Sequence, residues 1–335
     1  MLTYTIRRLI LAIPTLLFIS FVIFLIVKLS PSDPTAGLPL TIPPEVREQI
    51  RESLGVNDPV LMQYFKWLKL MVWDEPLHFI EGTTGWQVAP DGPRIISYQT
   101  RSPVMDLIAQ RMPQTLWVVG TSYIVGILIA LPLGIISAYR QYSVFDQIGT
   151  FISMVGFSVP TFFTGVLFIV IFAVNLGWFP SVYDTTHQVT DWDSFVVQIK
   201  QIIMPVMVLG LYNASQISRY LRASMLDNLN QDYVRTARAK GLSEKTVVLV
   251  HVLKNSMIPV VTVIALNVPA VFGGAIITEQ VFKVNGIGQL LIIAIQSGDV
   301  PVVQTVSFIF AVLIVLFSLI ADLLYGVLDP RIRYD

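Results

Sequence analysis

Histidine and cysteine are the residue types that most often carry acid–base, nucleophilic or metal chemistry, and this sequence has few of them. Its histidines are His78, His187 and His251, and it contains no cysteine. Each histidine falls in an expected loop, without a second histidine at metal-ligand spacing. We therefore expect no catalytic centre and no metal site in this chain. The lack of cysteine also excludes disulfides and thiolate nucleophiles.

The sequence motif for ATP binding and the motifs of two classes of hydrolytic enzyme are also missing. It contains no G-x-x-x-x-G-K-[ST] P-loop, no G-x-S-x-G nucleophile elbow and no H-E-x-x-H helix. The chain therefore does not itself hold ATP in a P-loop, and we do not expect it to be an enzyme. If it moves a solute uphill, another polypeptide must supply the energy.

Charged residues near apolar segments can mark a proton or ion pathway. Lys28 and Glu279 lie at the ends of such segments, and Asp322 lies about one turn from the end of the last one. We expect Asp322 to cap that segment or to pair with Arg331 or Arg333. No segment carries a charge near its centre. An ion-coupled carrier or channel, the main alternative function, should show central charges and internal repeats.

The composition indicates a membrane protein. Of the 335 residues, 54% are hydrophobic and only 13% are charged, whereas an average soluble domain has about 25% charged residues. A soluble protein of this size needs more polar surface than this sequence provides. Lysine plus arginine and aspartate plus glutamate both number 22, so no net charge favours nucleic acid as a partner.

Apolar runs long enough to cross a bilayer, about 20 residues each, recur along the chain. The third run contains Pro160, which is expected to kink it, and the fourth is short. Continuous apolar runs are unlike the alternation of a membrane β-barrel. We predict an all-α integral membrane protein with about six transmembrane helices. The runs are Leu9–Leu29, Thr115–Ala138, Phe151–Leu176, Ile202–Ser218, Met257–Thr278 and Val302–Tyr325.

The distribution of basic residues orients these helices. The segment 219–256 is rich in lysine and arginine, and the N-terminus adds Arg7 and Arg8. Because cytoplasmic loops carry the excess of basic residues, both termini and this segment are predicted to be cytoplasmic. The basic residues of the segment are Arg219, Arg222, Arg235, Arg238, Lys240, Lys245 and Lys254.

The same cytoplasmic segment is expected to form two helices joined at a glycine. Asp232 is placed to N-cap a first short helix, Gly241 to turn the chain in a left-handed conformation, and Ser243 to N-cap a second helix. Such a basic element can rest on lipid headgroups. Alternatively it is a rigid element that docks on a soluble subunit, because Ala237, Ala239 and Gly241 permit close approach of a partner backbone.

Several motifs in this order resemble the permease subunits of dipeptide, oligopeptide and nickel ABC importers. The stretch Arg235-Thr-Ala-Arg-Ala-Lys-Gly241 is similar to their "EAA" loop, in the wording of the peptide branch. Further matching motifs are Ser158-Val-Pro-Thr-Phe-Phe-Thr-Gly165, Arg219-Tyr-Leu-Arg-Ala-Ser-Met-Leu-Asp227, Pro301-Val-Val-Gln304 and Asp322-Leu-Leu-Tyr-Gly-Val-Leu-Asp-Pro-Arg-Ile-Arg333. The resemblance covers nearly the whole chain.

The resemblance implies a type I ABC importer permease architecture. Residues 1–29 would form the N-terminal tail and first helix, 30–113 a large external loop with amphipathic helices, and 114–335 a core of five helices with a cytoplasmic coupling loop at 222–256. The coupling helix would dock in a cleft of an ATPase subunit, where Arg235, Arg238 and Lys240 could pair with acidic residues. Its implied residues are Arg235, Thr236, Ala237, Arg238, Ala239, Lys240 and Gly241.

The resemblance also implies partners and a location. These are a second homologous permease, two cytoplasmic ATPase subunits that hold ATP and magnesium, an extracytoplasmic substrate-binding protein, and the lipid of a bacterial or archaeal cytoplasmic membrane. No cofactor is expected in this chain. Peptides are the default substrate, with oligosaccharides and metal chelates as alternatives. The sequence does not indicate which residues contact the substrate.

The external loop shows two expected helices and one departure from the related permeases. Pro44–Gly55 is typical of a charged surface helix, and Val60–Trp73 of an amphipathic helix. The turn-rich stretch Glu81–Pro93 replaces a shorter segment of the relatives, and Asn285-Gly286 stands where they tend to have Pro-Gly. The stripe expected along the amphipathic helix is Leu61, Tyr64, Phe65, Leu68 and Met71.

Overall fold

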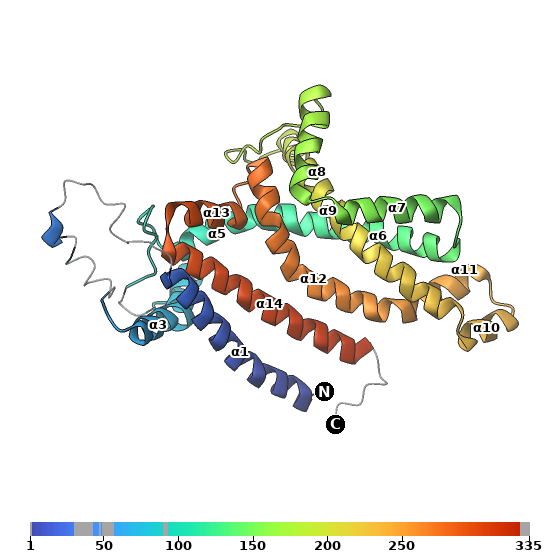
Figure 1. Cartoon of the computed structure of the whole chain (residues 1–335), viewed down its shortest axis with the longest axis horizontal. Coiled ribbons are helices and arrows are strands. Elements are labelled where there is room, and N and C mark those ends of the chain that lie inside the picture. The colour runs from blue at the N-terminus through green and yellow to red at the C-terminus, as the bar shows by residue number, and fades with distance from the viewer. Residues whose placement is uncertain (1, 30–42, 47, 49–56, 90–92, 329–335) are drawn as a thin grey trace. The chain divides into compact units, whose positions relative to one another are not determined.

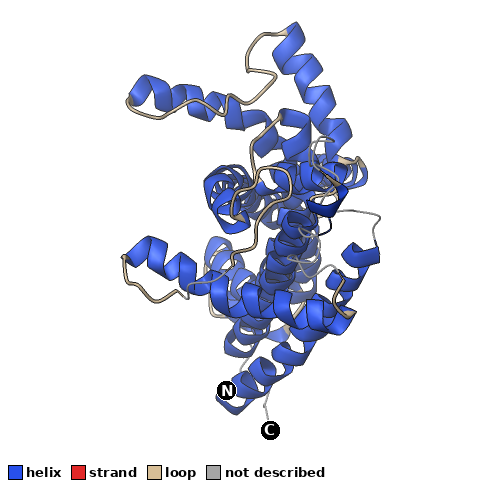
Figure 2. Ribbon diagram, turned by 90° about the vertical axis from the view of Figure 1, so that its left-hand side faces the viewer, coloured by secondary structure: helices blue, strands red, loops and turns tan. Residues whose placement is uncertain are grey.

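The structure is a computed structural model that describes residues 2–29, 43–46, 48, 57–89 and 93–328. The described residues form helices and connecting loops, and their strand-like pairing is an isolated bridge between Ile96 and Pro103 (Figure 2). The all-α prediction is thereby confirmed. The predicted helix Pro44–Gly55 lies largely outside the described residues.

Five described helical segments are long and apolar enough to cross a membrane. Two further helix pairs pass the same test but are sharply bent, Val144–Ser158 with Thr161–Asn175 by 104° and Ala275–Phe282 with Ile287–Ser297 by 85°. The predicted third run coincides with the first bent pair and breaks at Pro160, as expected, although a bend this large was not foreseen. The five segments are Thr5–Leu29, Val104–Tyr139, Trp192–Leu229, Glu244–Pro269 and Val300–Leu324.

By their internal contacts the residues form two compact units, each described separately below. Unit 1 comprises Met1–Leu11, Gln114–Gln289 and Leu313–Asp335, and unit 2 comprises Ala12–Pro113 and Leu290–Val312. Unit 1 contains the predicted cytoplasmic helix–glycine–helix element. Unit 2 contains the described part of the predicted external loop.

The centre of unit 1 is a close pair of long helices, α6 (Thr121–Tyr139) and α9 (Trp192–Leu229) (Figure 1). The buried residues Gly126, Ala130 and Gly134 follow one another at four-residue spacing on α6. A Cβ at Gly126 would lie 2.9 Å from Cβ of Asn213, and one at Gly134 would lie 3.0 Å from Leu221. Small residues at this spacing let two membrane helices approach closely, so glycine is required at both positions.

Helix α7 (Val144–Ser158) packs against the same pair and continues, after the break at Pro160, into α8 (Thr161–Phe168) and the π-helical segment η3 (Ile169–Asn175). Gly156 of α7 faces Ser215 of α9 so closely that a Cβ would overlap the serine hydroxyl. The hydroxyls of Ser153 and Ser218 lie 3.3 Å apart. Helices α6, α7 and α9 therefore form one tightly packed group.

Four further helical elements of unit 1 follow α9 along the chain. They are α10 (Asp232–Ala239), α11 (Glu244–Thr246), the π-helical segment η4 (Val247–Val252) and α12 (Leu253–Phe282). His251 lies in η4, and His78 lies in α4 (Glu75–Thr84) of unit 2, so the prediction that these two histidines fall in loops was wrong. The hydrophobic residues directly next to these histidines were the signal that could have placed them in helices, whereas the spacing of the histidines gave none.

In unit 1 the first helix α1 (Leu2–Leu29) and the last helix α14 (Val300–Leu328) are joined by an ion pair. Arg8 Nη1 lies 2.9 Å from Asp322 Oδ2. Arg8 was not predicted as a partner of Asp322, and the expected pairing with Arg331 or Arg333 stays a prediction. The two predicted partners lie outside the described residues.

Unit 2 is organised around the predicted amphipathic helix, which comprises α3 (Val60–Lys69) and the π-helical segment η1 (Leu70–Asp74) and leads into α4. The buried stripe is Tyr64, Trp67 and Met71, whereas Leu61 and Phe65 are 60% and 62% exposed. The predicted stripe was thus rotated by part of a turn. The cause is long-range packing, since Tyr64 hydrogen-bonds Ser20 of α1 at 2.8 Å and Trp67 contacts Phe308 edge-on.

A buried carboxylate fixes the turn that precedes α5 (Val104–Thr115) in unit 2. Glu75 is 1% exposed and accepts hydrogen bonds from the Ile95 amide at 2.7 Å and from Arg94 at 3.0 Å. Arg94 also reaches Asp106 at 3.2 Å. The charge of Glu75 is therefore paired within the unit, as the cost of an isolated buried charge requires.

Candidate functional site

The helix–glycine–helix element that the sequence predicted is formed by α10, Gly241 and α11. Gly241 has a φ of +75°, its amide donates to the Arg238 carbonyl, and the Leu242 amide donates to the Ala237 carbonyl. This pattern is the Schellman motif that ends a helix at a left-handed residue. Ser243 caps α11 by accepting from the Thr246 amide at 3.3 Å, as predicted.

One capping prediction was wrong. The residue before α10 is Gln231, whose side chain makes no capping hydrogen bond, and Asp232 is the first residue of the helix. The carboxylate of Asp232 instead lies 3.4 Å from Arg235 on the next turn. An acidic residue in the first turn still stabilises a helix, because its negative charge interacts favourably with the helix dipole. The helix was therefore predicted correctly, although the residue taken as its cap is its first residue.

One side of α10 is packed against the rest of unit 1. Val234 and Ala237 are 0% and 5% exposed and belong to one hydrophobic cluster with Met225 of α9 and Val247 and Val252 of η4. Ala237 is therefore occupied by contacts within the chain, and the expectation that it admits a partner backbone was wrong. Ala239 and Gly241 are exposed. The packed side holds α10 in a fixed orientation relative to α9.

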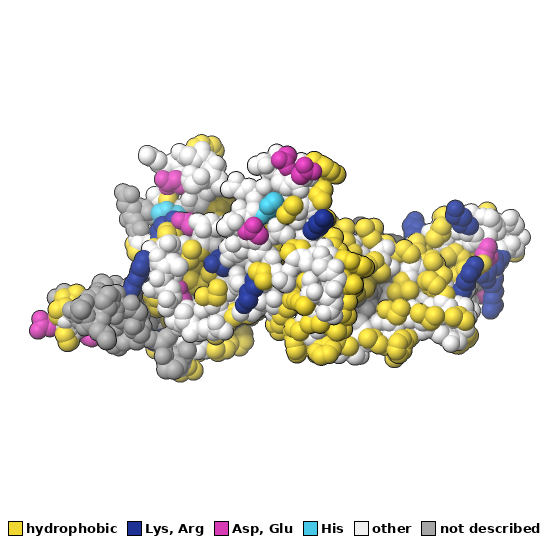
Figure 3. Space-filling view, turned by 90° about the horizontal axis from the view of Figure 1, so that it is seen from above, with side chains coloured by type: hydrophobic (Ala, Val, Ile, Leu, Met, Phe, Trp, Pro, Cys, Tyr) yellow, Lys and Arg dark blue, Asp and Glu magenta, His cyan; other side chains and the backbone are white. Residues whose placement is uncertain are grey.

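The opposite side of α10 is exposed and carries the predicted cations. The Arg235 side chain is 75% exposed, and that of Arg238 is 45% exposed. Arg238 donates to both carboxylate oxygens of Glu244, at 2.7 and 3.2 Å, across the turn at Gly241. Thr236 and Lys240 are exposed on the same short helix and its cap. In the space-filling view, basic side chains gather at the end of the molecule where Figure 1 places α10 and α11 (Figure 3).

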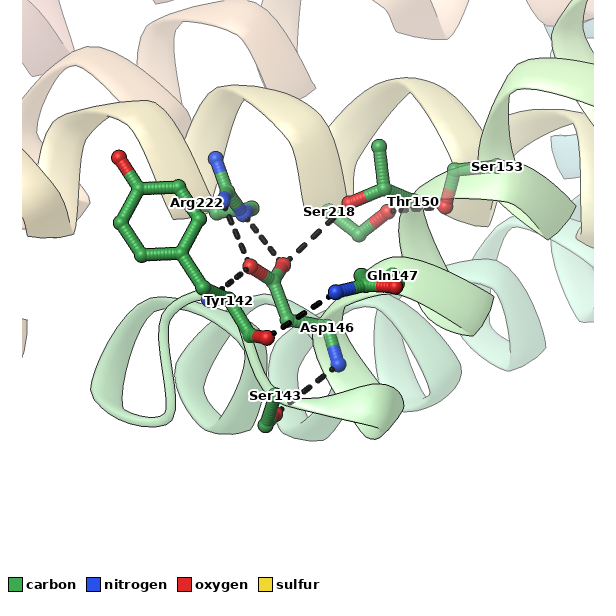
Figure 4. A network of polar contacts seen from close by, with 8 residues as sticks. All are labelled: Tyr142, Ser143, Asp146, Gln147, Thr150, Ser153, Ser218 and Arg222. Carbon is green, nitrogen blue, oxygen red and sulfur yellow. Dashed lines mark hydrogen bonds and ion pairs between the residues drawn. The ribbon is translucent and has the colours of Figure 1, made fainter.

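A buried ion pair connects α7 with the C-terminal part of α9, which leads to α10. Arg222 donates from Nε and Nη2 to the two oxygens of Asp146, at 2.7 and 2.8 Å, and Asp146 is 3% exposed (Figure 4). The Tyr142 amide and the Thr150 hydroxyl donate to the same carboxylate at 2.9 and 3.3 Å. Ser143 caps α7 beside it. Bidentate charged hydrogen bonds of this kind hold two elements in a defined geometry.

This ion pair was missed by sequence reasoning. Arg222 was assigned to a cytoplasmic loop, but α9 continues to Leu229, beyond the predicted end of the fourth run at Ser218. Its partner Asp146 lies 76 residues earlier in the chain. The signal in the sequence was that the helical pattern continues through residues 219–229, beyond the apolar run. Hydropathy alone does not reveal this extension, because this part of α9 is polar.

A cavity of about 500 Å³ lies in unit 1 where α7, α8, α9 and α12 meet. Its walls combine aromatic and aliphatic side chains with hydroxyl and amide groups. Phe157 and Tyr212 stack with ring centroids 6.0 Å apart, and the guanidinium of Arg219 lies 4.4 Å from the Phe157 ring centroid. The lining residues are Phe157, Ser158, Val159, Pro160, Thr161, Phe162, Leu209, Tyr212, Asn213, Gln216, Asn267 and Ile277.

The predicted span-end residue Glu279 is fully buried. Its carboxylate accepts from the Thr115 hydroxyl at 2.8 Å and from the Gln289 amide at 3.1 Å, and Thr115 accepts from the Ile287 amide at 2.8 Å. These amides open α13 (Ile287–Ser297), whose first turn favours a negative charge. A Cβ at Gly286 would overlap the carboxylate, which explains the glycine of the Asn285-Gly286 pair.

Comparison with known proteins identifies the family. A family model described as "Binding-protein-dependent transport system inner membrane component" matches residues 130–334, and the corresponding N-terminal model matches residues 1–119. The oligopeptide transport system permease protein AppB of Bacillus subtilis is 39% identical over 100% of both chains. The glutathione transport system permease protein GsiC of Escherichia coli strain K12 is 36% identical over 100% of both chains.

Among solved structures, a crystal structure of an amino acid ABC transporter with histidines aligns at a TM-score of 0.48 and 13% identity, over 68% of this chain and 95% of that one. The family models together span most of the chain, and the two named relatives span all of it. The importer assignment is therefore favoured over the ion-coupled carrier and the channel. The chain belongs to the inner membrane components of binding-protein-dependent transport systems, the permease subunits of ABC importers.

Proposed function

We propose that this chain forms half of the translocation pathway of an ATP-driven peptide importer. Peptides are supported by the names of its relatives, which are permeases for oligopeptides and for glutathione, itself a peptide. The other half would be a second, homologous permease. An extracytoplasmic binding protein would deliver the substrate, and two cytoplasmic ATPase subunits would hold ATP and magnesium and supply the energy.

Residues Arg235–Gly241, apart from the packed Ala237, would contact the ATPase. The observation that carries this assignment is the two-sided character of α10, which is packed on one side through Val234 and Ala237 and exposes Arg235 on the other. A helix held in this way can transmit a displacement of its partner to α9 without bending. We further propose that α10 and both chain ends are cytoplasmic, that residues 30–113 lie outside, and that residues 114–335 form the core that contains the coupling segment 222–256.

The test is the substitution Gly241→Pro in the complete importer. Proline fixes φ near −65° and lacks the amide that bonds the Arg238 carbonyl, so it cannot form the turn that ends α10. We expect the variant to reach the membrane but to lose co-purification of the ATPase subunits and substrate-stimulated ATP hydrolysis.

Gly177→Pro is the matched control, because Gly177 also has a positive φ, of +62°, but follows η3 rather than α10. The control variant should retain co-purification of the ATPase subunits and substrate-stimulated ATP hydrolysis. ATPase subunits that bind Gly241→Pro normally, with stimulated hydrolysis equal to that of the control, would refute the role of α10.

A further inference from the structure

The cavity of unit 1 contains a buried hydrogen-bond donor with no partner. Asn213 on α9 is 6% exposed, and its Nδ2 atom makes no hydrogen bond. Buried polar groups are nearly always paired, and leaving one unpaired is costly. Because Asn213 lines the cavity, a molecule bound there could accept the hydrogen bond that the chain itself does not provide.

Two more side-chain amides line the same cavity. Gln216 lies three residues after Asn213 on α9, a spacing that puts both on one face of the helix. Asn267 reaches the cavity from α12. Each carboxamide offers both a donor and an acceptor, which are the two groups that a peptide bond presents.

The other walls of the cavity restrict the chemistry of its ligand. None of the lining residues given above carries an acidic, basic or imidazole side chain, so they offer no ligand suited to a chelated metal and no charge for an ion. Phe157, Phe162 and Leu209 supply apolar surface. A cavity of about 500 Å³ falls within the range of small-ligand sites, roughly 300–1,000 Å³.

We infer that Asn213, Gln216 and Asn267 bind the main-chain amide groups of a short peptide in transit, while the apolar walls accept its variable side chains. This inference rests on the proposed function, and it assigns the substrate contacts within it. Recognition through main-chain groups explains how one cavity could serve peptides of different sequence. Two of these three amides, Asn213 and Gln216, lie on α9, the helix that leads to α10.

The experiment measures uptake by the complete importer with its own partner subunits in proteoliposomes. The probes are trialanine and its analogue with an ester in place of the first amide, which lacks one N–H donor. Asn213→Leu, Gln216→Leu and Asn267→Leu remove each amide at similar volume. Gln147→Leu is the control, because Gln147 is an exposed amide on α7 whose side chain donates to the Tyr142 carbonyl, outside both the cavity lining and the coupling segment.

We expect each cavity variant to raise KM for trialanine about three- to tenfold, the loss of one neutral hydrogen bond, and Gln147→Leu to leave it unchanged. The preference for trialanine over the ester should shrink in at least one cavity variant. Because the binding protein and ATPases are the same in every assay, a changed preference belongs to this chain. Asn213→Leu should not lower thermal stability, since it removes an unpaired donor.

Three outcomes are decisive against the inference. If wild-type importer takes up trialanine but all three cavity variants match it in KM and in ester preference, the contacts are wrong and the proposed function stands. If the variants lose stability in proportion to uptake, the amides have a structural role only. If the wild-type importer ignores both peptides but takes up an oligosaccharide such as maltotriose, the proposed peptide function and this inference both fail.

Discussion

The buried ion pair between Asp146 and Arg222 predicts an energetic coupling between α7 and α9 that can be measured directly. Asp146 is 3% exposed, and the Arg222 side chain is 26% exposed. Removing one member of a buried pair costs about 3–5 kcal/mol, largely because the other charge is left unpaired. The carboxylate is the more deeply buried of the two charges. We therefore expect Arg222→Ala to destabilise the protein more than Asp146→Ala.

The magnitudes follow from this difference in exposure. Arg222→Ala should cost about 3–4 kcal/mol, since the buried carboxylate keeps only the Tyr142 amide and the Thr150 hydroxyl. Asp146→Ala should cost about 2–3 kcal/mol, because the freed guanidinium can recover part of its hydration. The double variant should cost about 2 kcal/mol less than the sum of the two single variants.

The assay is a double-mutant cycle in detergent, with reversible denaturation followed by tryptophan fluorescence. The pair Arg238–Glu244 is the matched control, because it has the same bidentate geometry but side chains that are 45% and 39% exposed. Exposed pairs contribute about 0–1 kcal/mol. A coupling energy at Asp146–Arg222 no larger than that of the control pair would refute the reasoning.

Two further predictions concern the ends of helices. Gly288→Ala should prevent accumulation of folded protein, because the added Cβ would lie 2.5 Å from the backbone Cα of Ile276. Gly286→Ala should reduce the yield less, because its Cβ would meet the end of the Glu279 side chain. Membrane yields of the two variants that rank the other way would contradict this. Asp191 caps α9, and hydrogen bonds from Ser194 lower the pKa of its carboxyl group. The cap therefore stabilises the helix fully above the ordinary aspartate pKa, about 3.9, and this stabilisation is lost as the pH falls through the lowered pKa. Hydrogen exchange should show reduced protection at the start of α9 in that pH range, and Asp191→Asn, which caps without titrating, should lose this pH dependence.

Hydropathy and cap residues made the local features of this fold predictable. Apolar runs located the membrane helices because a spanning helix must be apolar over about 20 residues. Gly241 and Ser243 located the turn after α10, because a left-handed residue and a hydroxyl cap are local requirements of the backbone. Both kinds of signal are contained within a few neighbouring residues.

The features that sequence reasoning missed depend on residues far apart in the chain. Glu279 gave no sign of burial, because its partner Thr115 lies 164 residues earlier. Pro160 marks a break in the helix, but the 104° bend is set by how α7 and α8 pack. The cavity amides were not singled out, since Asn213, Gln216 and Asn267 become a group only when α9 and α12 are brought together.

The position of α9 explains how one chain can connect its cavity to α10. Roughly 24 Å of helix axis separates Asn213 from Leu229, at about 1.5 Å per residue, and the ion pair at Arg222 lies between them. Helix α9 cannot slide along α6 while Gly126 and Gly134 hold the two backbones in close contact, nor leave α7 without unpairing Asp146. A displacement applied at α10 must therefore move α6, α7 and α9 together.

The nearest backbone break that could absorb such a movement is at Val159–Pro160, where Val159 is extended and both residues line the cavity. A coupled movement of this group would thus change the shape of the cavity at its α8 wall, while the amides on α9 keep their relative positions.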